Sequence, residues 1–295
     1  MKLAGYIELL RPFTLLAPLI VSLSVMIASL VYTNTASLDV FALLPILLPA
    51  SVSFALLNAG SNALNQATDW KEDAVSKPYR PIPEGIVSRK EAYLASTALY
   101  GIALFLALAI NSTFALIVTL IAVFSITYSV PPRIKKILFL NQAWVALPRG
   151  FLGIIGSWSV FGDPLQPLPL TMGSIAALYL FGGTATKDIL DAEADKSVGT
   201  KTMINVFGMK TTAVVSLFFM VAAFLLIVPL IVFHVLDSMF FPLAFLVLLS
   251  SIIGWSMLHT RHNHTCENTS AWTLMYATYF VFALGFAMIT IVFSA

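Results

Sequence analysis

Charge is scarce in this chain of 295 residues: Asp, Glu, Lys and Arg make up 10% of it, whereas hydrophobic residues make up 59%. An ordinary soluble domain contains about 25% charged residues. The composition therefore excludes a water-soluble globular protein and indicates a polytopic membrane protein. The single cysteine, Cys266, excludes a disulfide within the chain. The net charge is only +2, and we expect no nucleic acid partner and no obligate protein partner.

We expect no cleavable signal peptide in this sequence. The apolar run after Arg11 is too long for the apolar region of such a signal, and it lacks a clear cleavage site of small residues. We therefore expect this run to be retained as a first membrane span.

Long apolar segments dominate the sequence. A bilayer core of about 30 Å requires about 20 helical residues, and nine segments qualify. Their approximate limits are 13–33, 42–66, 90–110, 113–130, 139–161, 169–187, 211–234, 239–259 and 271–294. The prediction is an all-α polytopic membrane protein with nine transmembrane helices, forming a single integral-membrane domain over residues 1–295.

The distribution of basic residues predicts the orientation. With nine spans, every Lys and Arg except Arg149 falls on the side of the N-terminus and of the connections after spans two, four, six and eight. The opposite connections contain Asp39, Asp163 and Asp237 but no basic residue. By the positive-inside rule the basic side is cytoplasmic. We therefore predict a multi-pass cell-membrane protein with a cytoplasmic N-terminus and an external C-terminus.

A row of oxygen-bearing side chains ends the second predicted span. Asn65, Asp69 and Asp73 are four residues apart, which places them on one face of a helix, and Lys77 and Arg80 follow within two turns. Carboxylates beside cations at the end of an apolar run favour a divalent metal that bridges to phosphate oxygens. The alternative is a solvated connection whose charges only keep it in water.

A second polar row follows the sixth predicted span. Its members are Asp188, Asp191 and Asp195, with Lys187 and Lys201 beside them. The recurrence indicates two pseudo-repeated four-helix units, at about 10–136 and 137–260, followed by a ninth span at about 271–294. If the units pack with pseudo-twofold symmetry, the two rows face each other across a central cavity. Mg²⁺ is then the expected cofactor, because it prefers oxygen ligands and commonly pairs carboxylates with substrate phosphates.

The amino-acid sequences of the two rows are distinctive. The first reads N-x-x-x-D-x-x-x-D followed by Y-R-P-I-P, and the second reads K-D-x-x-D-x-E-x-D followed by G-x-K-T. Together they resemble the two aspartate-rich motifs of the UbiA superfamily of intramembrane prenyltransferases. The likeness covers nearly the whole chain, because that family also has nine transmembrane helices and places its motifs after the second and the sixth. It implies Mg²⁺-dependent transfer of a prenyl chain from a prenyl diphosphate to a lipophilic acceptor, through ionisation to an allylic carbocation.

The resemblance also implies roles for individual residues. The expected ligands of two Mg²⁺ ions are Asn65, Asp69, Asp73, Asp188, Asp191 and Asp195. The expected substrate-binding residues are Asn65, Lys77, Arg80, Arg133, Lys135, Lys187 and Lys201, and the expected catalytic residues are Asp69, Asp73, Asp191, Asp195 and Tyr128. The family's Tyr-x-x-x-Lys element matches at Tyr128, but Pro132 occupies the lysine position. We therefore expect Arg133 or Lys135 to replace that lysine.

Arg149 is the only basic residue inside a predicted span, about two turns into the fifth. Burying a guanidinium against lipid costs about 2.5–3.5 kcal/mol on insertion scales, so we expect Arg149 to face the cavity. Two interpretations stay open at this point. It binds the diphosphate or an acidic acceptor group, or it forms a structural pair with an acidic side chain.

The sequence leaves the acceptor open. An aromatic acid such as 4-hydroxybenzoate, in a quinone route, and geranylgeranylglyceryl phosphate both carry the negative charge that a basic cavity residue would bind, and the Y-R-P-I-P run is also similar to the chlorophyll branch of the family. The alternative from another class is a secondary transporter whose carboxylates bind coupling ions. Transporter carboxylates, however, usually lie near the membrane midplane in broken helices, whereas these lie at predicted cytoplasmic ends. A lipid-binding scaffold would not need two metal-binding rows.

Overall fold

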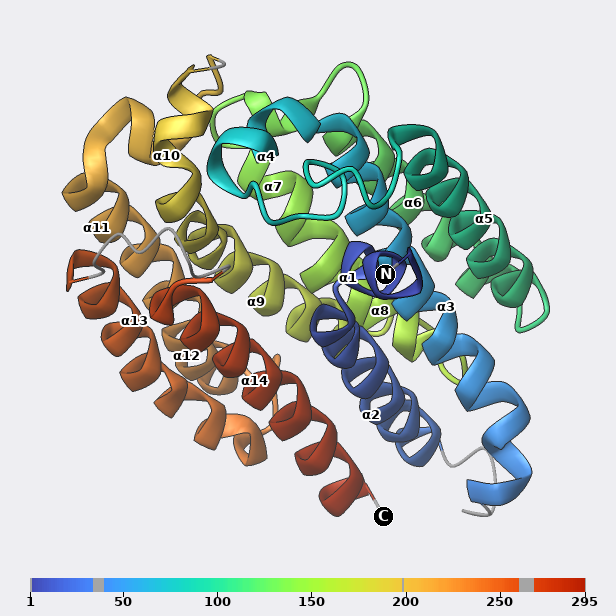
Figure 1. Ribbon diagram of the computed structural model, residues 1–295. Helices are drawn as coiled ribbons and strands as arrows, with labels where there is room; N and C mark the ends of the chain where they lie inside the picture. The colour runs from blue at the N-terminus through green and yellow to red at the C-terminus, as the bar shows by residue number, and fades with distance from the viewer. Residues whose placement is uncertain (1, 34–39, 198, 260–267, 295) are drawn as a thin grey trace.

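The computed structural model describes residues 2–33, 40–197, 199–259 and 268–294, and Cys266 lies outside them. Every regular element in these ranges is a helix (Figure 1). In chain order the elements are α1 (Lys2–Leu10), η1 (Pro12–Leu15), α2 (Leu16–Tyr32), α3 (Val40–Thr68), α4 (Trp70–Ser76), α5 (Arg89–Leu108), α6 (Ser112–Ser129), η2 (Ile134–Lys136), α7 (Leu140–Ala146), η3 (Leu147–Phe151), α8 (Leu152–Trp158), α9 (Pro167–Gly183), η4 (Thr184–Lys187), α10 (Asp188–Ser197), α11 (Met203–Leu225), α12 (Ile227–Val232), η5 (Ser238–Leu246), α13 (Val247–His259) and α14 (Ser270–Ser294). The predicted all-α class is confirmed.

Eight helical segments in the described ranges are long and apolar enough to cross a bilayer. They are Pro12–Tyr32, Phe41–Thr68, Arg89–Leu108, Ser112–Ser129, Pro167–Glu193, Met203–Val232, Ser238–His259 and Ser270–Ser294. They match the predicted spans one to four and six to nine. Large apolar side chains such as Phe105, Phe218 and Trp255 are exposed on the outside of the bundle. An apolar outer surface of this kind suits contact with lipid.

The count of nine spans is not confirmed, because the fifth predicted span is not one long α-helix. It is divided into α7, the π-helical turn η3 and α8, which follow one another from Leu140 to Trp158. Pro148 lies in the π turn and has no N–H to donate to the preceding turn. Single π turns inside helices frequently lie at functional sites, and this one carries Arg149.

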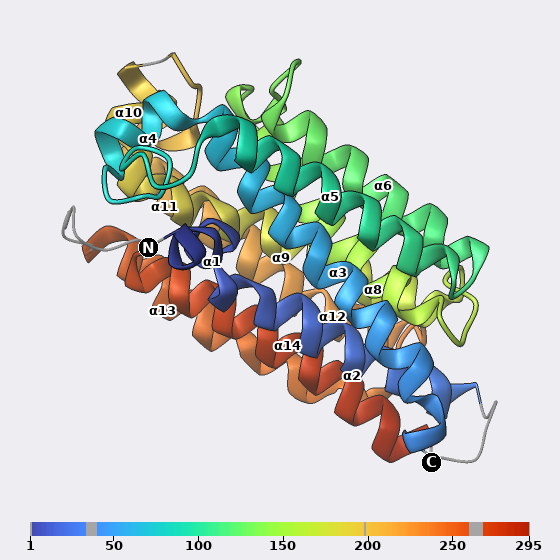
Figure 2. The same cartoon turned by 45° about the vertical axis from the view of Figure 1, so that its right-hand side comes forward.

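Three short helices that the span analysis did not predict, α1, α4 and α10, lie toward one end of the bundle, and the C-terminus lies at the other (Figures 1 and 2). Helix α3 fixes the first residues of the chain. The side-chain amides of Asn58, Asn62 and Gln66, four residues apart, donate to backbone carbonyls within residues 9–14 at 2.8–3.0 Å. This amide row was visible in the sequence as a four-residue spacing, but the sequence analysis missed it.

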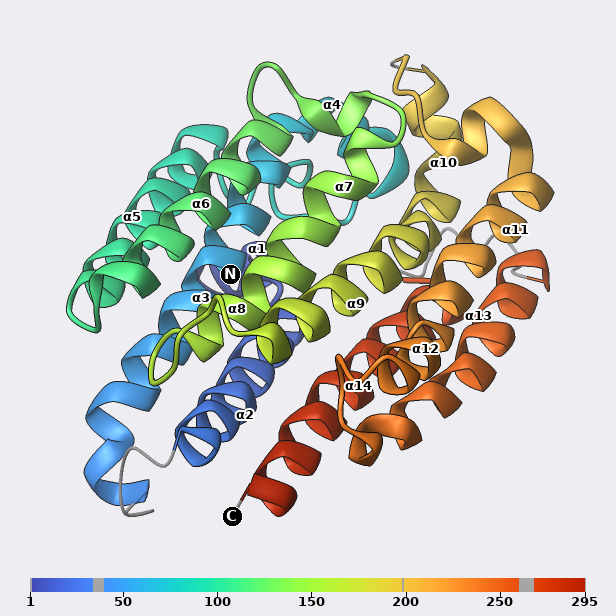
Figure 3. The ribbon, with the colours of Figure 1, turned by 180° about the vertical axis from the view of Figure 1, so that it is seen from behind.

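The interior contains two large apolar clusters. One joins α9, α11, α13 and α14 around fully buried aromatic side chains that include Tyr179, Phe224, Phe282 and Phe286. The other joins α3, α5 and α6. Helices α7 and α8 pack between α6 and α9 and connect the two halves (Figure 3). The two-repeat interpretation of the chain stays a prediction.

Gly182 allows α9 to pack closely against α11. A Cβ atom at this position would lie 2.5 Å from the carbonyl oxygen of Ser216 and 2.8 Å from Cβ of Phe219. These distances are shorter than any van der Waals contact, and the first of them is to backbone. A side chain at position 182 would therefore force the two helices apart.

We expect Gly182→Ala to lower the free energy of unfolding by roughly 1–3 kcal/mol, because overpacking a close contact shifts backbone. Thermal unfolding in detergent would measure this as a lower Tm. Gly101→Ala is the matched control, since Gly101 lies inside α5 with nothing within 4 Å of its would-be Cβ. The control should keep or slightly raise the Tm. An equal effect of the two substitutions would contradict the proposed close packing.

Candidate active site

A polar chamber lies where α4 and α10 meet. It has about 1350 Å³ of empty space, part of which is open to solvent. Its acidic lining residues are Asp69, Glu72, Asp73, Asp188, Asp191 and Asp195, and its basic lining residues are Arg11, Lys77, Arg80, Lys135, Arg149 and Lys187. Asn65 and Tyr128 also line it. All six predicted metal ligands therefore share one chamber, in which six acidic side chains face six basic ones.

The first row lies on a kinked helix. Helix α3 ends at Thr68, and Asp69 has non-helical dihedral angles (φ −99°, ψ 14°) before α4 begins. The four-residue hydrogen-bond ladder nevertheless continues, because the N–H of Asp69 donates to the carbonyl of Asn65 at 2.9 Å and the N–H of Asp73 donates to that of Asp69 at 2.8 Å. The row thus keeps the shared face that its spacing predicted.

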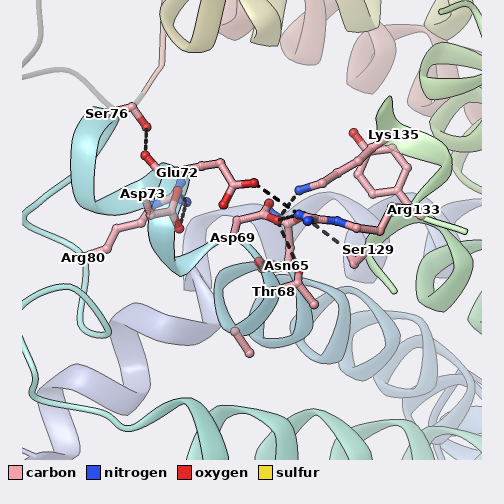
Figure 4. Close-up of polar contacts among 12 residues, drawn as sticks. Asn65, Thr68, Asp69, Glu72, Asp73, Ser76, Arg80, Ser129, Arg133 and Lys135 are labelled. Atoms are coloured by element: carbon pink, nitrogen blue, oxygen red, sulfur yellow. Dashed lines mark hydrogen bonds and ion pairs between the residues drawn. The ribbon is translucent and has the colours of Figure 1, made fainter. Parts of the chain in front are cut away.

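Asp73 forms a buried ion pair with Arg80. The guanidinium Nη1 donates to both carboxylate oxygens at 2.8 Å, and each side chain is only 7% exposed (Figure 4). Burial raises the pKa of Asp73, and the positive charges of Arg80 and Lys77 oppose that rise. The arginine that was predicted to bind phosphate therefore also compensates a buried carboxylate.

Two basic side chains from the segment after α6 form ion pairs with Asp69. Arg133 Nη2 lies 2.8 Å from Asp69 Oδ1, and Lys135 forms an ion pair with the same oxygen (Figure 4). Arg133 also lies 3.4 Å from Glu72. Asn65 Oδ1 accepts a hydrogen bond from the Ser129 hydroxyl at 3.3 Å. Arg133 and Lys135, the two expected replacements for the family's lysine, whose position Pro132 occupies here, thus both reach the site.

The second row is on α10 and contacts the first. Lys77, at the end of α4, forms an ion pair with Asp191 and so bridges the two rows. Asp195 is partly buried, and burial together with the negative charges of Asp188 and Asp191 raises the pKa of Asp195 to about 7. Glu193, which lies between Asp191 and Asp195 in the sequence, is exposed.

Lys187 connects the second row to α6. Its ammonium group donates to the phenol oxygen of Tyr128 and lies 4.9 Å from the centre of that ring. Its Nζ is also 3.8 Å from Asp188. Tyr128 therefore has a lysine partner that comes from the second motif rather than from its own loop.

The oxygen donors of the two rows suit Mg²⁺ in kind. Asp188 Oδ2 is buried and has no hydrogen-bond partner, so this oxygen could accept a cation. The described residues contain no group of three His, Cys, Asp or Glu side chains close enough to hold one ion, since the carboxylates bind lysines and arginines instead. Metal binding would therefore require side chains to rotate away from these ion pairs.

Arg133 contacts Asp69 without lining the polar chamber, and Lys201 is the predicted site residue that lies outside the site altogether. Its side chain is exposed and does not line the chamber. The chain turns at Gly199, where φ is +73°, and the N–H of Thr200 donates to the carbonyl of Asp195 at 2.8 Å. Its neighbours Thr200 and Thr202 do line the chamber, so it is the direction of the Lys201 side chain that excludes it, which a motif in one dimension does not reveal.

An apolar chamber adjoins the polar one. It is lined mainly by α2, α3, α6, α7 and α14 and includes Phe54, Leu57, Ile121 and Trp144. Its empty space is about 930 Å³, part of it open. Five residues line both chambers and define the junction: Thr14, Ser61, Tyr128, Val145 and Arg149. A ligand with a polar head and a greasy tail could therefore lie across this junction.

Comparison with known proteins decides the family. A sequence profile of the UbiA prenyltransferase family matches residues 21–278. The chain belongs to the UbiA prenyltransferase family. Digeranylgeranylglyceryl phosphate synthases from Methanobrevibacter smithii and Methanothermobacter thermautotrophicus are 24% and 28% identical to it over 97% of this chain, with 99% and 97% of their own lengths covered.

Solved UbiA structures share the fold. A UbiA homologue from Archaeoglobus fulgidus, bound to GPP and Mg²⁺, superimposes with a TM-score of 0.68 at 20% identity and covers 98% of this chain and 99% of that one. A UbiA homologue from Aeropyrum pernix K1 gives a TM-score of 0.69 at 16% identity and covers 94% of this chain and 98% of that one. The resemblance seen in the motifs is thereby confirmed. The protein is a UbiA-type membrane prenyltransferase that transfers a prenyl chain to a lipophilic acceptor, which favours the enzyme over the transporter.

In this UbiA enzyme we expect Arg80→Met to lower the free energy of unfolding by about 3 kcal/mol, because it leaves the Asp73 carboxylate buried without its partner. Thermal unfolding in detergent is the measurement. The double variant Asp73→Leu with Arg80→Met should lose less free energy of unfolding than Asp73→Leu and Arg80→Met lose in sum as single variants. Lys90→Met, at an exposed position at the start of α5, is the control and should leave the Tm unchanged. If the double variant lost as much free energy of unfolding as the two single variants together, the stabilising Asp73–Arg80 ion pair would be contradicted.

Proposed function

We propose that this enzyme catalyses the Mg²⁺-dependent transfer of a prenyl chain from a prenyl diphosphate to an isoprenylglyceryl phosphate acceptor. The observation that carries the proposal is the joined pair of chambers, one lined by two carboxylate rows and their cations and the other apolar, with Tyr128 at the junction. A prenyl diphosphate has a matching division into an anionic head and a greasy tail.

The polar chamber would hold the diphosphate. Two Mg²⁺ ions would be held by Asn65, Asp69 and Asp73 on one side and by Asp188, Asp191 and Asp195 on the other. Bound Mg²⁺ would neutralise the charge that develops on the leaving diphosphate. When the carboxylates turn to the metal, Lys77, Arg133 and Lys135 lose their present partners and become available to phosphate oxygens. The leaving group would then meet fixed positive charge in a site with little water.

The apolar chamber would hold the prenyl tail, so that the bond between C1 and the diphosphate oxygen lies at the junction. Tyr128 is the aromatic residue that lines both chambers, and Lys187 holds its hydroxyl. The face of an aromatic ring stabilises a neighbouring cation. Tyr128 would thus stabilise the allylic cation, and the apolar walls would keep water from it.

The choice of acceptor rests on the relatives. The two that cover nearly the whole chain carry the name digeranylgeranylglyceryl phosphate synthase. Of the acceptors left open by the sequence, these names favour the glyceryl phosphate over an aromatic acid. By the positive-inside rule, the concentration of basic residues at this end of the chain's spans supports a cytoplasmic position for the polar chamber, with the C-terminus outside.

We expect purified enzyme in lipid nanodiscs to convert geranylgeranyl diphosphate and geranylgeranylglyceryl phosphate into a diprenylated product and diphosphate, detected by mass spectrometry, and to stop when EDTA removes Mg²⁺. Asp69→Asn and Asp191→Asn should each lower kcat at least about 100-fold, because each removes a charge that holds the metal. Glu193→Gln, an exposed carboxylate on the same helix α10, should retain activity.

Activity that survives both aspartate substitutions would contradict the assignment of the two rows. Product formed only with 4-hydroxybenzoate or another aromatic acid would overturn the acceptor while preserving the prenyl transfer.

A further inference from the structure

Arg149 lies at an unusual place in the chain. It belongs to the π-helical turn η3 inside the bundle and lines both the polar and the apolar chamber. Much of its side chain is accessible, and that accessible part borders the chambers. Its guanidinium is therefore presented at the junction where the two chambers meet.

Within the part of the chain that the structure describes, no carboxylate compensates this guanidinium. Lys77, Arg80, Lys135 and Lys187, which line the same polar chamber, each lie within 4.0 Å of an aspartate. Arg149 has no such partner among the residues that the structure describes, and its side chain donates only to the neutral Asn58 Oδ1, at 3.1 Å. The structural pairing with an acidic side chain, one of the two interpretations of the sequence, is therefore not found in the described ranges. Ionisable residues inside membrane-spanning segments usually face a cavity and mark a substrate site, so a ligand is the expected source of the anion.

The protein nevertheless holds Arg149 in place. Asn58 is itself fixed, because its amide donates to the backbone carbonyl and to the hydroxyl of Thr14 at 3.0 and 3.1 Å. The backbone carbonyl of Arg149 accepts a hydrogen bond from the Tyr279 hydroxyl at 2.8 Å. A Cβ on the next residue, Gly150, would lie 2.6 Å from the backbone nitrogen of Ala177, so η3 is pressed against α9. These contacts orient a charged group before any ligand binds.

We infer that Arg149 forms a second anion-binding site, which recognises the negatively charged headgroup of the acceptor. The inference rests on the proposed function and assigns a separate position to the second substrate. The donor's diphosphate would bind among the paired lysines and arginines of the two rows, whereas the acceptor's phosphate or carboxylate would bind at the junction. A planar guanidinium can donate two parallel hydrogen bonds to either anion. Anchoring the headgroup there places the acceptor's nucleophile beside Tyr128, where the donor's C1 would lie.

The test compares Arg149→Gln with the unsubstituted enzyme on two acceptors, geranylgeranylglyceryl phosphate and the uncharged geranylgeranylglycerol. We expect the KM of the phosphorylated acceptor to rise roughly 10- to 100-fold, as loss of a charge-assisted bidentate contact requires. The KM of the uncharged acceptor and the KM of the diphosphate donor should stay within about twofold. Lys210→Gln removes an exposed cation that lines neither chamber and should change none of these constants.

Two further variants keep the test decisive. Arg149→Lys keeps the positive charge but not the two parallel N–H donors of the guanidinium. It should give an intermediate KM for the phosphorylated acceptor. Tyr279→Phe removes the hydrogen bond from the Tyr279 hydroxyl to the carbonyl of Arg149. It should raise the KM of the phosphorylated acceptor by a smaller factor and leave the KM of the diphosphate donor unchanged. Binding of the phosphorylated acceptor without donor, measured by calorimetry, should weaken in the same order.

Stability separates a ligand site from a structural role. Arg149→Gln should keep or raise the Tm, because it removes an uncompensated charge, whereas loss of a structural ion pair would lower it. An equal rise in the KM of the donor, or equal effects on the charged and uncharged acceptors, would overturn the inference. If instead the unsubstituted enzyme formed no product with any acceptor, the proposed function itself would fail.

Discussion

Compensation of charge inside an apolar bundle is the constraint on which the rest of this structure depends. Six acidic and six basic side chains line one chamber, and most of them are paired directly. Burial and the negative charges of Asp188 and Asp191 raise the pKa of Asp195 to about 7, which shows that carboxylates gathered here need positive charge beside them to stay ionised. The pairs keep the carboxylates together at neutral pH and hold the cations close to where a diphosphate would bind.

The same ion pairs hold the ends of separate helices together. Lys77 joins α4 to α10, and Arg133 and Lys135 join the segment after α6 to Asp69. Helices α4 and α10 are therefore fixed by charges that also belong to the site. In a membrane protein the apolar outer surfaces give helices little reason to prefer one neighbour over another, so polar contacts and close packing at small residues such as Gly182 specify the arrangement.

Several departures from regular helix lie at or beside the chambers. Asp69 interrupts the helix between α3 and α4, Arg149 lies in a π turn, and Arg11 and Arg133 both have positive φ of 53°. Backbone strain of this kind persists where the surroundings enforce it and is frequent at functional sites. Here the surroundings are identifiable, because the amide row of α3 holds the segment that contains Arg11 and the Tyr279 hydroxyl binds the carbonyl of Arg149.

Class, most of the spans and the two acidic rows could be predicted from the sequence, because apolar length and a four-residue spacing are local properties that survive folding. The spacing placed Asn65, Asp69 and Asp73 together even though the helix bends at Asp69, since the backbone ladder continues through the bend. Predictions failed where a distant contact or a local irregularity of the backbone decides the position of a side chain or the regularity of a helix. Lys201 is exposed outside the chamber that its neighbours Thr200 and Thr202 line, and the fifth span contains a π turn.

By itself the sequence determined that this protein crosses the membrane, that its polar residues gather at a few helix ends, and that two rows of oxygen ligands recur. Only the tertiary structure decided which cation meets which carboxylate, that Lys187 rather than a residue of the neighbouring loop binds Tyr128, and that Arg149 has an amide instead of an acid beside it. The physical reason is that composition and periodicity act along the chain, whereas the partner of a charge depends on side chains that approach through space from other helices.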